Sequence, residues 1–225
     1  MYLGGWAVTA GIVAVPAAAS PCSPGGTCIP DVFPAVSSGS LVASLTHTMT
    51  SASGALTVTY TAAVYADPAN SYCAGCLDFL FQYNNHSSST DSILRVTATD
   101  FTPVLTDLGY TRSGASEPGG LFVNGTVAPI SDDRNFTGDT IGWNFQSSNL
   151  VAPGATSDVI EVQTNAMNFA NGFTFVVDGG VTQGPSFAPP PPVVQTPELQ
   201  WVAGAAVLGA GLAAVVLTRR RGRVR

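Results

Sequence analysis

The chain has 225 residues, of which 14 are acidic and eight are basic, and charged residues make up only 10% of the sequence. Five of the eight arginines lie in the last seven positions, so residues 1–218 carry a formal charge of 3 minus 14, or −11. An acidic body without clustered lysine or arginine excludes nucleic acid as a partner, because phosphate binding needs such clusters. The abundance of Ser, Thr, Gly and Val favours a β-rich secreted domain over a helical enzyme.

The N-terminal segment, residues 1–19, is apolar and rich in small residues. The alanines that end at Ala19, just before Ser20, fit the small-x-small pattern that signal peptidase recognises. This predicts a signal peptide over 1–19 and export of the rest of the chain. The positively charged start of a typical signal peptide is missing, since the first basic residue is Arg95, so a short buried N-terminal segment is the alternative.

Residues 20–182 alternate short β-branched or aromatic runs with turn residues, and no stretch shows a sustained helical period. In Leu56–Tyr60, apolar residues alternate with threonines, as in a strand that buries one face. The pattern predicts an all-β extracytoplasmic domain, an antiparallel β-sandwich of the Ig-like or jelly-roll-like kind. The expected strands are Leu41–Met49, Leu56–Tyr65, Leu77–Tyr83, Ile93–Thr99, Leu121–Ile130, Thr140–Phe145, Asp158–Thr164 and Phe173–Val177.

Residues 183–198 follow this domain and include the proline run Pro189–Pro192. Such a segment is predicted to be an extended, stiff stalk, because proline-rich sequences adopt the polyproline conformation. The stalk ends in a short polar box, Thr196, Pro197 and Glu198.

The apolar run Trp201–Leu217 is long enough to predict a single transmembrane helix over residues 199–218. Its 17 residues would extend about 25 Å as a helix. Three glycines in the run and the arginine cluster behind it disfavour the alternative, a buried core helix. By the positive-inside rule, residues 219–225 would form a cytoplasmic tail that stops transfer through Arg219, Arg220, Arg221, Arg223 and Arg225.

Four cysteines form two close pairs, Cys22 with Cys28 and Cys73 with Cys76. Export favours disulfides, and of the three possible connectivities the local pairing is the simplest. A four-thiolate zinc site is the alternative, although 44 residues separate the two pairs. A strand-like sequence follows Cys76 where a redox Cys-x-x-Cys motif would need a helix. We therefore predict structural disulfides, no metal and no other cofactor.

The polar residues show no recognised catalytic motif. The two histidines, His47 and His86, stand beside no nucleophile or metal-ligand pattern, so a triad would have to assemble through space. Asp78 and Asp100 would be a candidate carboxylate pair if the chain were a glycoside hydrolase. No catalytic residue is predicted.

A second acidic group, Asp132 and Asp133 with Asp139, is predicted to lie in a loop. Carboxylates in a loop can bind calcium, but the regular spacing of a calcium loop is missing. A solvated turn is the preferred interpretation.

The end of the chain resembles that of bacterial surface proteins of the PEP-CTERM type, in which a Val-Pro-Glu-Pro box precedes an apolar helix and an arginine cluster. Here the box reads Thr196-Pro-Glu-Leu, so its Pro and Glu are kept and its first and last residues differ. The resemblance implies recognition of Thr196, Pro197 and Glu198 by a membrane-embedded exosortase. Further segments that look like the bodies of such proteins are Cys73–Asn85, Arg95–Val96, Phe101–Tyr110, Trp143–Phe145, Val151–Asp158, Gln163–Ala166 and Phe173–Gly180.

These features together predict a membrane-anchored or exosortase-sorted surface protein with a structural or matrix role and no catalytic activity. Its expected partners are the membrane, an exosortase and extracellular polysaccharide. One alternative is a carbohydrate-binding or adhesion module, in which exposed Tyr60, Tyr65, Tyr83 or Trp143 would stack on sugar rings. A secreted hydrolase is the second alternative.

Overall fold

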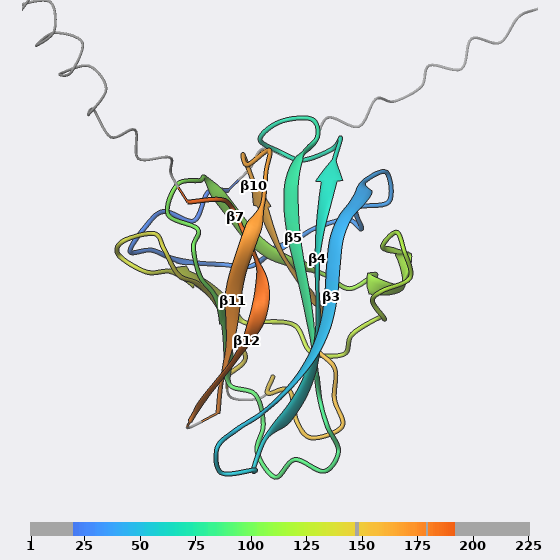
Figure 1. Cartoon of the computed structure of the whole chain (residues 1–225), viewed down its shortest axis with the longest axis vertical. Helices are drawn as coiled ribbons and strands as arrows, with labels where there is room; N and C mark the ends of the chain where they lie inside the picture. Colours follow the sequence, from blue (N-terminus) through green and yellow to red (C-terminus); the bar gives the residue numbers. More distant parts are fainter. Residues whose placement is uncertain (1–19, 147–148, 179, 192–225) are drawn as a thin grey trace, which may run out of the picture. The chain divides into compact units, whose positions relative to one another are not determined.

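The structure is a computed structural model that describes residues 20–146, 149–178 and 180–191. These residues form two six-stranded β-sheets that pack face to face as a β-sandwich (Figure 1). The predicted all-β architecture is therefore confirmed. The single helical element in the described residues is a three-residue 3₁₀ turn, Gly114–Ser116.

Sheet A has the strand order β1-β8-β9-β6-β11-β12, and every neighbouring pair in it is antiparallel. Short strands with polar residues form one half of the sheet, and the β11–β12 hairpin forms the other. Its strands are β1 (Thr27–Cys28), β6 (Arg95–Ala98), β8 (Ser131–Arg134), β9 (Ile141–Asn144), β11 (Ala170–Val177) and β12 (Val181–Ala188).

Sheet B has the order β2-β7-β10-β5-β4-β3 and is antiparallel except for the parallel pair β2–β7. That pair depends on Gly109, because a Cβ at this position would overlap the backbone of Asp31. Its strands are β2 (Asp31–Val32), β3 (Ser40–Thr50), β4 (Thr57–Asp67), β5 (Cys76–Asn85), β7 (Thr106–Thr111) and β10 (Val159–Thr164).

The main core lies between the sheets and uses alternate residues of each strand, as the period of two requires. Phe79 packs edge-on against Phe101, and Phe81 lies against Trp143, which is fully buried. A second, smaller core covers the opposite face of sheet B, where Tyr65 and Leu80 pack under loop residues. Because sheet B is covered on both faces, it has few solvent-facing positions in β5, β7 and β10.

Most predicted strands are confirmed in place, but one predicted strand is missing and several observed strands are additional. The predicted strand Leu121–Ile130 forms no regular strand; the backbone of Val123 is instead bound by the side chain of Gln82. Strands β1, β2, β7, β8 and β12 match no predicted strand.

The stalk prediction is wrong at its start, because residues 183–188 belong to β12 and pair with β11. Pro185 lies inside this strand, which is possible since β12 is at the edge of its sheet and needs to donate backbone hydrogen bonds on one side only. The ordered domain thus extends beyond the predicted boundary at residue 182.

Across the described ranges, no helix has both the length and the apolar character needed to cross a membrane. The predicted signal peptide (1–19), transmembrane helix (199–218) and arginine tail (219–225) lie outside the described residues.

Candidate functional site

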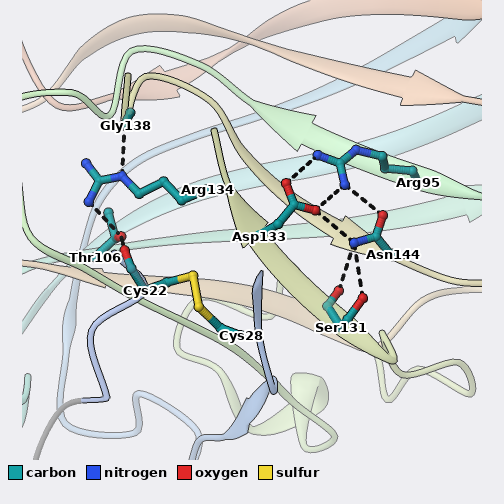
Figure 2. Close-up of a disulfide and its surroundings, with 9 residues drawn as sticks. All are labelled: Cys22, Cys28, Arg95, Thr106, Ser131, Asp133, Arg134, Gly138 and Asn144. Atoms are coloured by element: carbon teal, nitrogen blue, oxygen red, sulfur yellow. Dashed lines mark hydrogen bonds and ion pairs between the residues drawn. A yellow bond between two sulfur atoms is a disulfide. The ribbon is translucent and has the colours of Figure 1, made fainter. Parts of the chain in front are cut away.

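The two cysteine pairs are both disulfide-bonded locally, as the simplest of the three connectivities predicts. The Cα atoms are 5.9 Å apart in Cys22–Cys28 and 5.3 Å apart in Cys73–Cys76. Cys28 pairs with β8 of sheet A, while the backbone N–H of Cys22 donates to the carbonyl of Thr106 in sheet B over 2.9 Å. The first disulfide therefore links the two sheets at one end of the sandwich (Figure 2).

The metal alternatives find no support in this geometry. Within the described ranges, no group of three or more His, Cys, Asp or Glu side chains is arranged to hold a metal ion. The expectation of an acidic loop is wrong, because Asp132 and Asp133 lie in strand β8. Since successive side chains of a strand point to opposite faces, these two carboxylates cannot share one ion.

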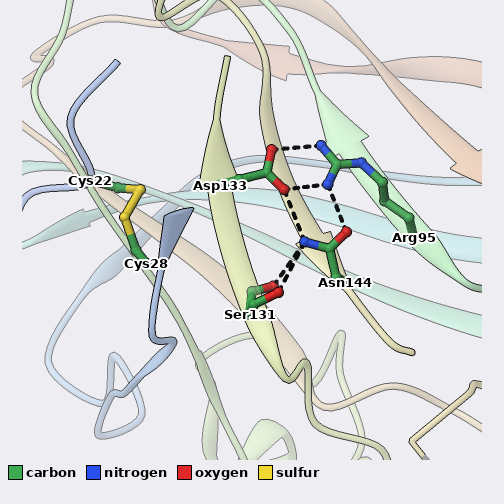
Figure 3. Close-up of polar contacts among 6 residues, drawn as sticks. All are labelled: Cys22, Cys28, Arg95, Ser131, Asp133 and Asn144. Carbon is green, nitrogen blue, oxygen red and sulfur yellow. Dashed lines mark hydrogen bonds and ion pairs between the residues drawn. A yellow bond between two sulfur atoms is a disulfide. The ribbon is translucent and has the colours of Figure 1, made fainter. Parts of the chain in front are cut away.

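The outward face of β8 carries a compact polar cluster on sheet A, formed by Arg95, Ser131, Asp133 and Asn144 (Figure 3). The Arg95 guanidinium donates to both oxygens of Asp133, at 2.7 Å for the Nη2–Oδ1 contact, and to the amide oxygen of Asn144 at 2.7 Å. The Asn144 amide in turn donates to Asp133 Oδ2 at 2.9 Å. Although partial burial acts in the opposite direction, these hydrogen bonds lower the pKa of Asp133.

The inward face of β8 holds Asp132 and Arg134, both buried. Asp132 pairs in register with Trp143, and neither its two carboxyl oxygens nor the indole N–H has a hydrogen-bond partner. Burial, followed by repulsion from Asp133 and other nearby acids, raises the pKa of Asp132 to about 8. Asp132 is therefore largely a neutral carboxylic acid near neutral pH.

Arg134 binds backbone carbonyl groups. Its Nε donates to Gly138 O at 2.9 Å, and its Nη2 donates to Phe101 O at 2.6 Å and Val104 O at 2.9 Å. Its Nη1 donates to the hydroxyl of Thr106 at 3.2 Å (Figure 2). Arg134 thus ties the β8–β9 hairpin to the loop before β7 and to β7 itself, a role that its sequence context did not indicate.

A second group of buried carboxyl groups lies on the outer face of sheet B. Asp78 on β5 and Glu161 on β10 are fully buried, and one oxygen of each has no partner. Burial is the first cause that raises the pKa of each, and neighbouring carboxyl groups add to it. The remaining oxygen of Asp78 accepts from Asn70 at 2.6 Å, and that of Glu161 accepts from Gln163 at 3.1 Å.

Two further acids of this face are also buried. Burial raises the pKa of Asp107 to about 6 and that of Glu117 to about 7. Asp107 accepts from the backbone N–H of Ser20 at 3.0 Å, and Glu117 accepts from that of Val36 at 2.9 Å. Among the described residues, the hydrogen-bond donors to these four carboxyl groups are the loop residues Ser20, Val36 and Asn70 and the β10 side chain of Gln163, and none is an arginine. The cluster can therefore retain protons.

The proposed hydrolase pair, Asp78 with Asp100, is not brought together. Asp78 lies on the outer face of sheet B, while Asp100 follows β6 in sheet A, so sheet B and the core lie between them. Sequence reasoning missed Glu161, the real neighbour of Asp78. In the sequence, Glu161 alternates with Ile160 and Val162, a pattern typical of a strand that exposes its polar face to solvent. In the structure, loops cover that face of β10 and bury Glu161.

The aromatic side chains proposed to stack on sugars are in the core. Tyr60, Tyr65, Tyr83 and Trp143 are at most 1% exposed, so the stacking hypothesis is wrong for all four. The Tyr60 and Tyr83 hydroxyls bond within the protein, to Pro185 O and to the Thr174 hydroxyl.

The exposed polar surface of sheet B lies instead on β3 and β4. Three cross-strand threonine pairs form a ladder there, which we call the threonine ladder: Thr46–Thr61, Thr48–Thr59 and Thr50–Thr57, with Oγ1 separations of 3.1, 2.7 and 3.3 Å. His86 extends the middle row, with Nε2 at 2.8 Å from Thr59 Oγ1. His47 lies on the other face of β3 against the ring of Tyr60. The two histidines are therefore separated by the sheet and form no joint site.

The sorting-box residues Thr196, Pro197 and Glu198, and the arginines from Arg219 onward, lie outside the described residues. Their roles stay predictions. In comparisons with known proteins, no family model, no curated protein and no solved structure matches this chain.

Proposed function

We propose that this chain is an exported bacterial surface protein with a structural role and no catalytic activity, held at the membrane or sorted there through its C-terminal tail. The observation that carries this proposal is that both cysteine pairs are disulfide-bonded. Structural disulfides persist in oxidising compartments outside the cytoplasm. They agree with the signal-like residues 1–19 and the membrane-length segment 199–218.

The structural role is supported by the placement of the reactive groups. Asp78 and Glu161 have no exposed surface, and the buried Arg134 is committed to backbone carbonyls. Functional groups of this kind stabilise a fold and are not presented to a substrate. An Ig-like or jelly-roll-like connection of the strands, and processing near Glu198, are the finer parts of the same proposal.

Intact-mass analysis of the full-length chain recovered from its host tests export. The expected mass lacks residues 1–19 and four hydrogens, two for each disulfide. A mass that retains the first 19 residues with four free thiols would contradict the proposal.

Anchoring is tested by a chain that ends at Gln200, before Trp201. This variant should be released into the medium, whereas the control variant Glu198→Gln keeps the apolar segment and should stay with the membrane fraction, also where the substitution blocks processing, because an uncut chain retains its anchor. Retention of the truncated chain at the level of the full chain would contradict anchoring through the tail.

Polysaccharide binding is a second candidate function, and the threonine ladder favours it. Its hydroxyl groups are arrayed on two adjacent strands without a charged side chain among them, and such rows can hydrogen-bond to sugar hydroxyls. A pull-down on insoluble polysaccharides should show retention that Thr46→Val with Thr48→Val abolishes. The matched Thr→Ser pair keeps the hydroxyls and should bind; equal binding of the valine variant would eliminate this candidate.

A further inference from the structure

The edges of the two sheets differ in how they are protected against pairing with another strand. A free edge presents unpaired backbone N–H and C=O groups, and natural proteins protect it with very short strands, proline or charge. In the described residues, β1 and β2 are two residues long and β12 contains Pro185. The fourth edge, β3, is 11 residues long and has neither proline nor a charged Asp, Glu, Lys or Arg side chain.

β3 is also accessible over most of its length. Figure 1 shows it as the outermost strand of the β5–β4–β3 run. Ser44, Thr46, Thr48 and Thr50 are exposed on its outer side. A register shift between Leu41 and Ala43 disturbs its pairing at one end, and the Thr182 hydroxyl of β12 donates to the Thr50 carbonyl at the other, so Ala43–Met49 is the part that another strand could join.

We propose that β3 pairs antiparallel with β3 of a second copy of this chain, which joins two B sheets into one continuous sheet. A second copy is favoured by charge. Residues 20–191 hold 13 of the chain's 14 acidic residues and three of its arginines, so the domain stays net negative even with the buried Asp78, Asp132 and Glu161 neutral, and two copies repel each other. The Ser40–Thr50 edge has no acidic residue and avoids that repulsion.

The side chains of β3 are also complementary to themselves. An antiparallel strand can face an identical strand across a two-fold axis, which is the isologous contact of a symmetric dimer. If the two strands pair so that Ser44, Thr46 and Thr48 lie on the same face of the joined sheet in both copies, Thr46 and Thr48 face Ser and Thr side chains of the other copy. These are cross-strand pairs of the kind that β3 already makes with β4, where Thr48 and Thr59 hydroxyl oxygens are 2.7 Å apart.

This inference does not depend on export or anchoring, and its test leaves the tail unchanged. The full-length chain in mild detergent is examined by sedimentation over a range of concentrations. The wild type should form a dimer. The double variant Thr46→Lys with Thr48→Lys should raise the dissociation constant about tenfold or more, because like charges then face each other across the two strands.

The control is Val181→Lys with Gln183→Lys, which puts two lysines on exposed positions of the other long edge, β12. This variant should dimerise like the wild type. Mixing the β3 lysine variant with Thr46→Glu, Thr48→Glu chains should restore dimers as heterodimers, which a merely misfolded lysine variant could not do. A monomeric wild type, or dimers that the β3 lysines leave intact, would overturn the proposal.

Discussion

Asp132 and Asp133 are neighbours on β8, yet their pKa values shift in opposite directions. Asp133 points outward, where Arg95 and Asn144 donate hydrogen bonds to its carboxylate, and its pKa is lowered. Asp132 points inward beside Trp143, has no hydrogen-bond partner, and its pKa is raised to about 8. One residue step along a strand thus decides whether a carboxyl group carries its charge.

The arginines of the same region show the same contrast. Arg95, on the outward side, is partly exposed and pairs with Asp133. Arg134, on the inward side, is 4% exposed and donates to the carbonyls of Phe101, Val104 and Gly138. Water can replace a lost partner of the partly exposed Arg95 but not one of the buried Arg134. The hydrogen bonds of Arg134 should therefore contribute far more to stability than those of Arg95.

The largest expected effect is that of Arg134→Met. The substitution keeps the apolar volume but removes the donor to the carbonyls of Gly138 and Val104 and the shorter of the two hydrogen bonds to the carbonyl of Phe101, which should lower the free energy of unfolding by about 3–5 kcal/mol. Arg134→Lys should recover little, because one ammonium group cannot reproduce the fork of the guanidinium. Urea unfolding followed by tryptophan fluorescence measures both.

Arg95→Met is the matched outward control and should cost about 1 kcal/mol or less. Equal losses for the two methionine variants would show that burial does not separate the two faces of β8.

The second effect is a gain of stability on acidification. An acid whose pKa is raised by folding still holds its proton in the folded chain at pH values at which the unfolded chain has released it. Its contribution to stability is therefore full below pH 4 and is lost as the pH rises through its pKa in the folded chain. For Asp107, Glu117 and Asp132 those values are about 6, 7 and 8. The free energy of unfolding should therefore fall by at least about 2 kcal/mol between pH 5 and pH 8.

Asp132→Asn separates the contribution of Asp132 from the others. This variant removes the ionisation that takes place near pH 8, so its stability should fall less steeply than that of the wild type above pH 6. Asp133→Asn should keep a fall in stability but end it at a lower pH, because burial still raises the pKa of Asp132 while the repulsion from Asp133 is removed. Urea titrations at several pH values test both expectations, and a wild-type stability that rises from pH 5 to pH 8 would contradict the assignment of neutral buried acids.

Strand periodicity was enough to predict the sandwich and most of its strands, because each strand buries alternate residues whatever the loops do. The local disulfides followed from the close spacing of the two cysteine pairs in the sequence. In β7, Leu108 and Tyr110 alternate with Asp107 and Gly109, so the period of two is present there as well. Asp and Gly are uncommon in strands, however, and the segment was therefore not recognised as one. The edge strand β12 was obscured by Pro185 in the same way.

The environment of the carboxyl groups could not be predicted from local pattern. Whether Glu161 meets water depends on distant segments, since residues near Val36, Asn70 and Phe122 cover the outer face of sheet B. Similarly, Asp132 and Asp133 are a charged pair in the sequence, and only their placement in a strand assigns them to opposite faces. Long-range coverage leaves no periodic signal in the covered residue.

The smallest expected effect is the pH dependence of the outward pair. Because the pKa of Asp133 is lowered in the folded chain, its contribution is present above its unfolded value near 4 and is lost as pH falls through the folded value. Asp133→Asn should therefore cost about 1 kcal/mol at pH 7 and nothing measurable at pH 2. Added salt should reduce this cost at pH 7, because the pair is partly exposed and screening weakens it. A cost that is the same at both pH values would mean that Asp133 acts through its shape and amide contacts, and the contrast between the two faces of β8 would then not be one of charge.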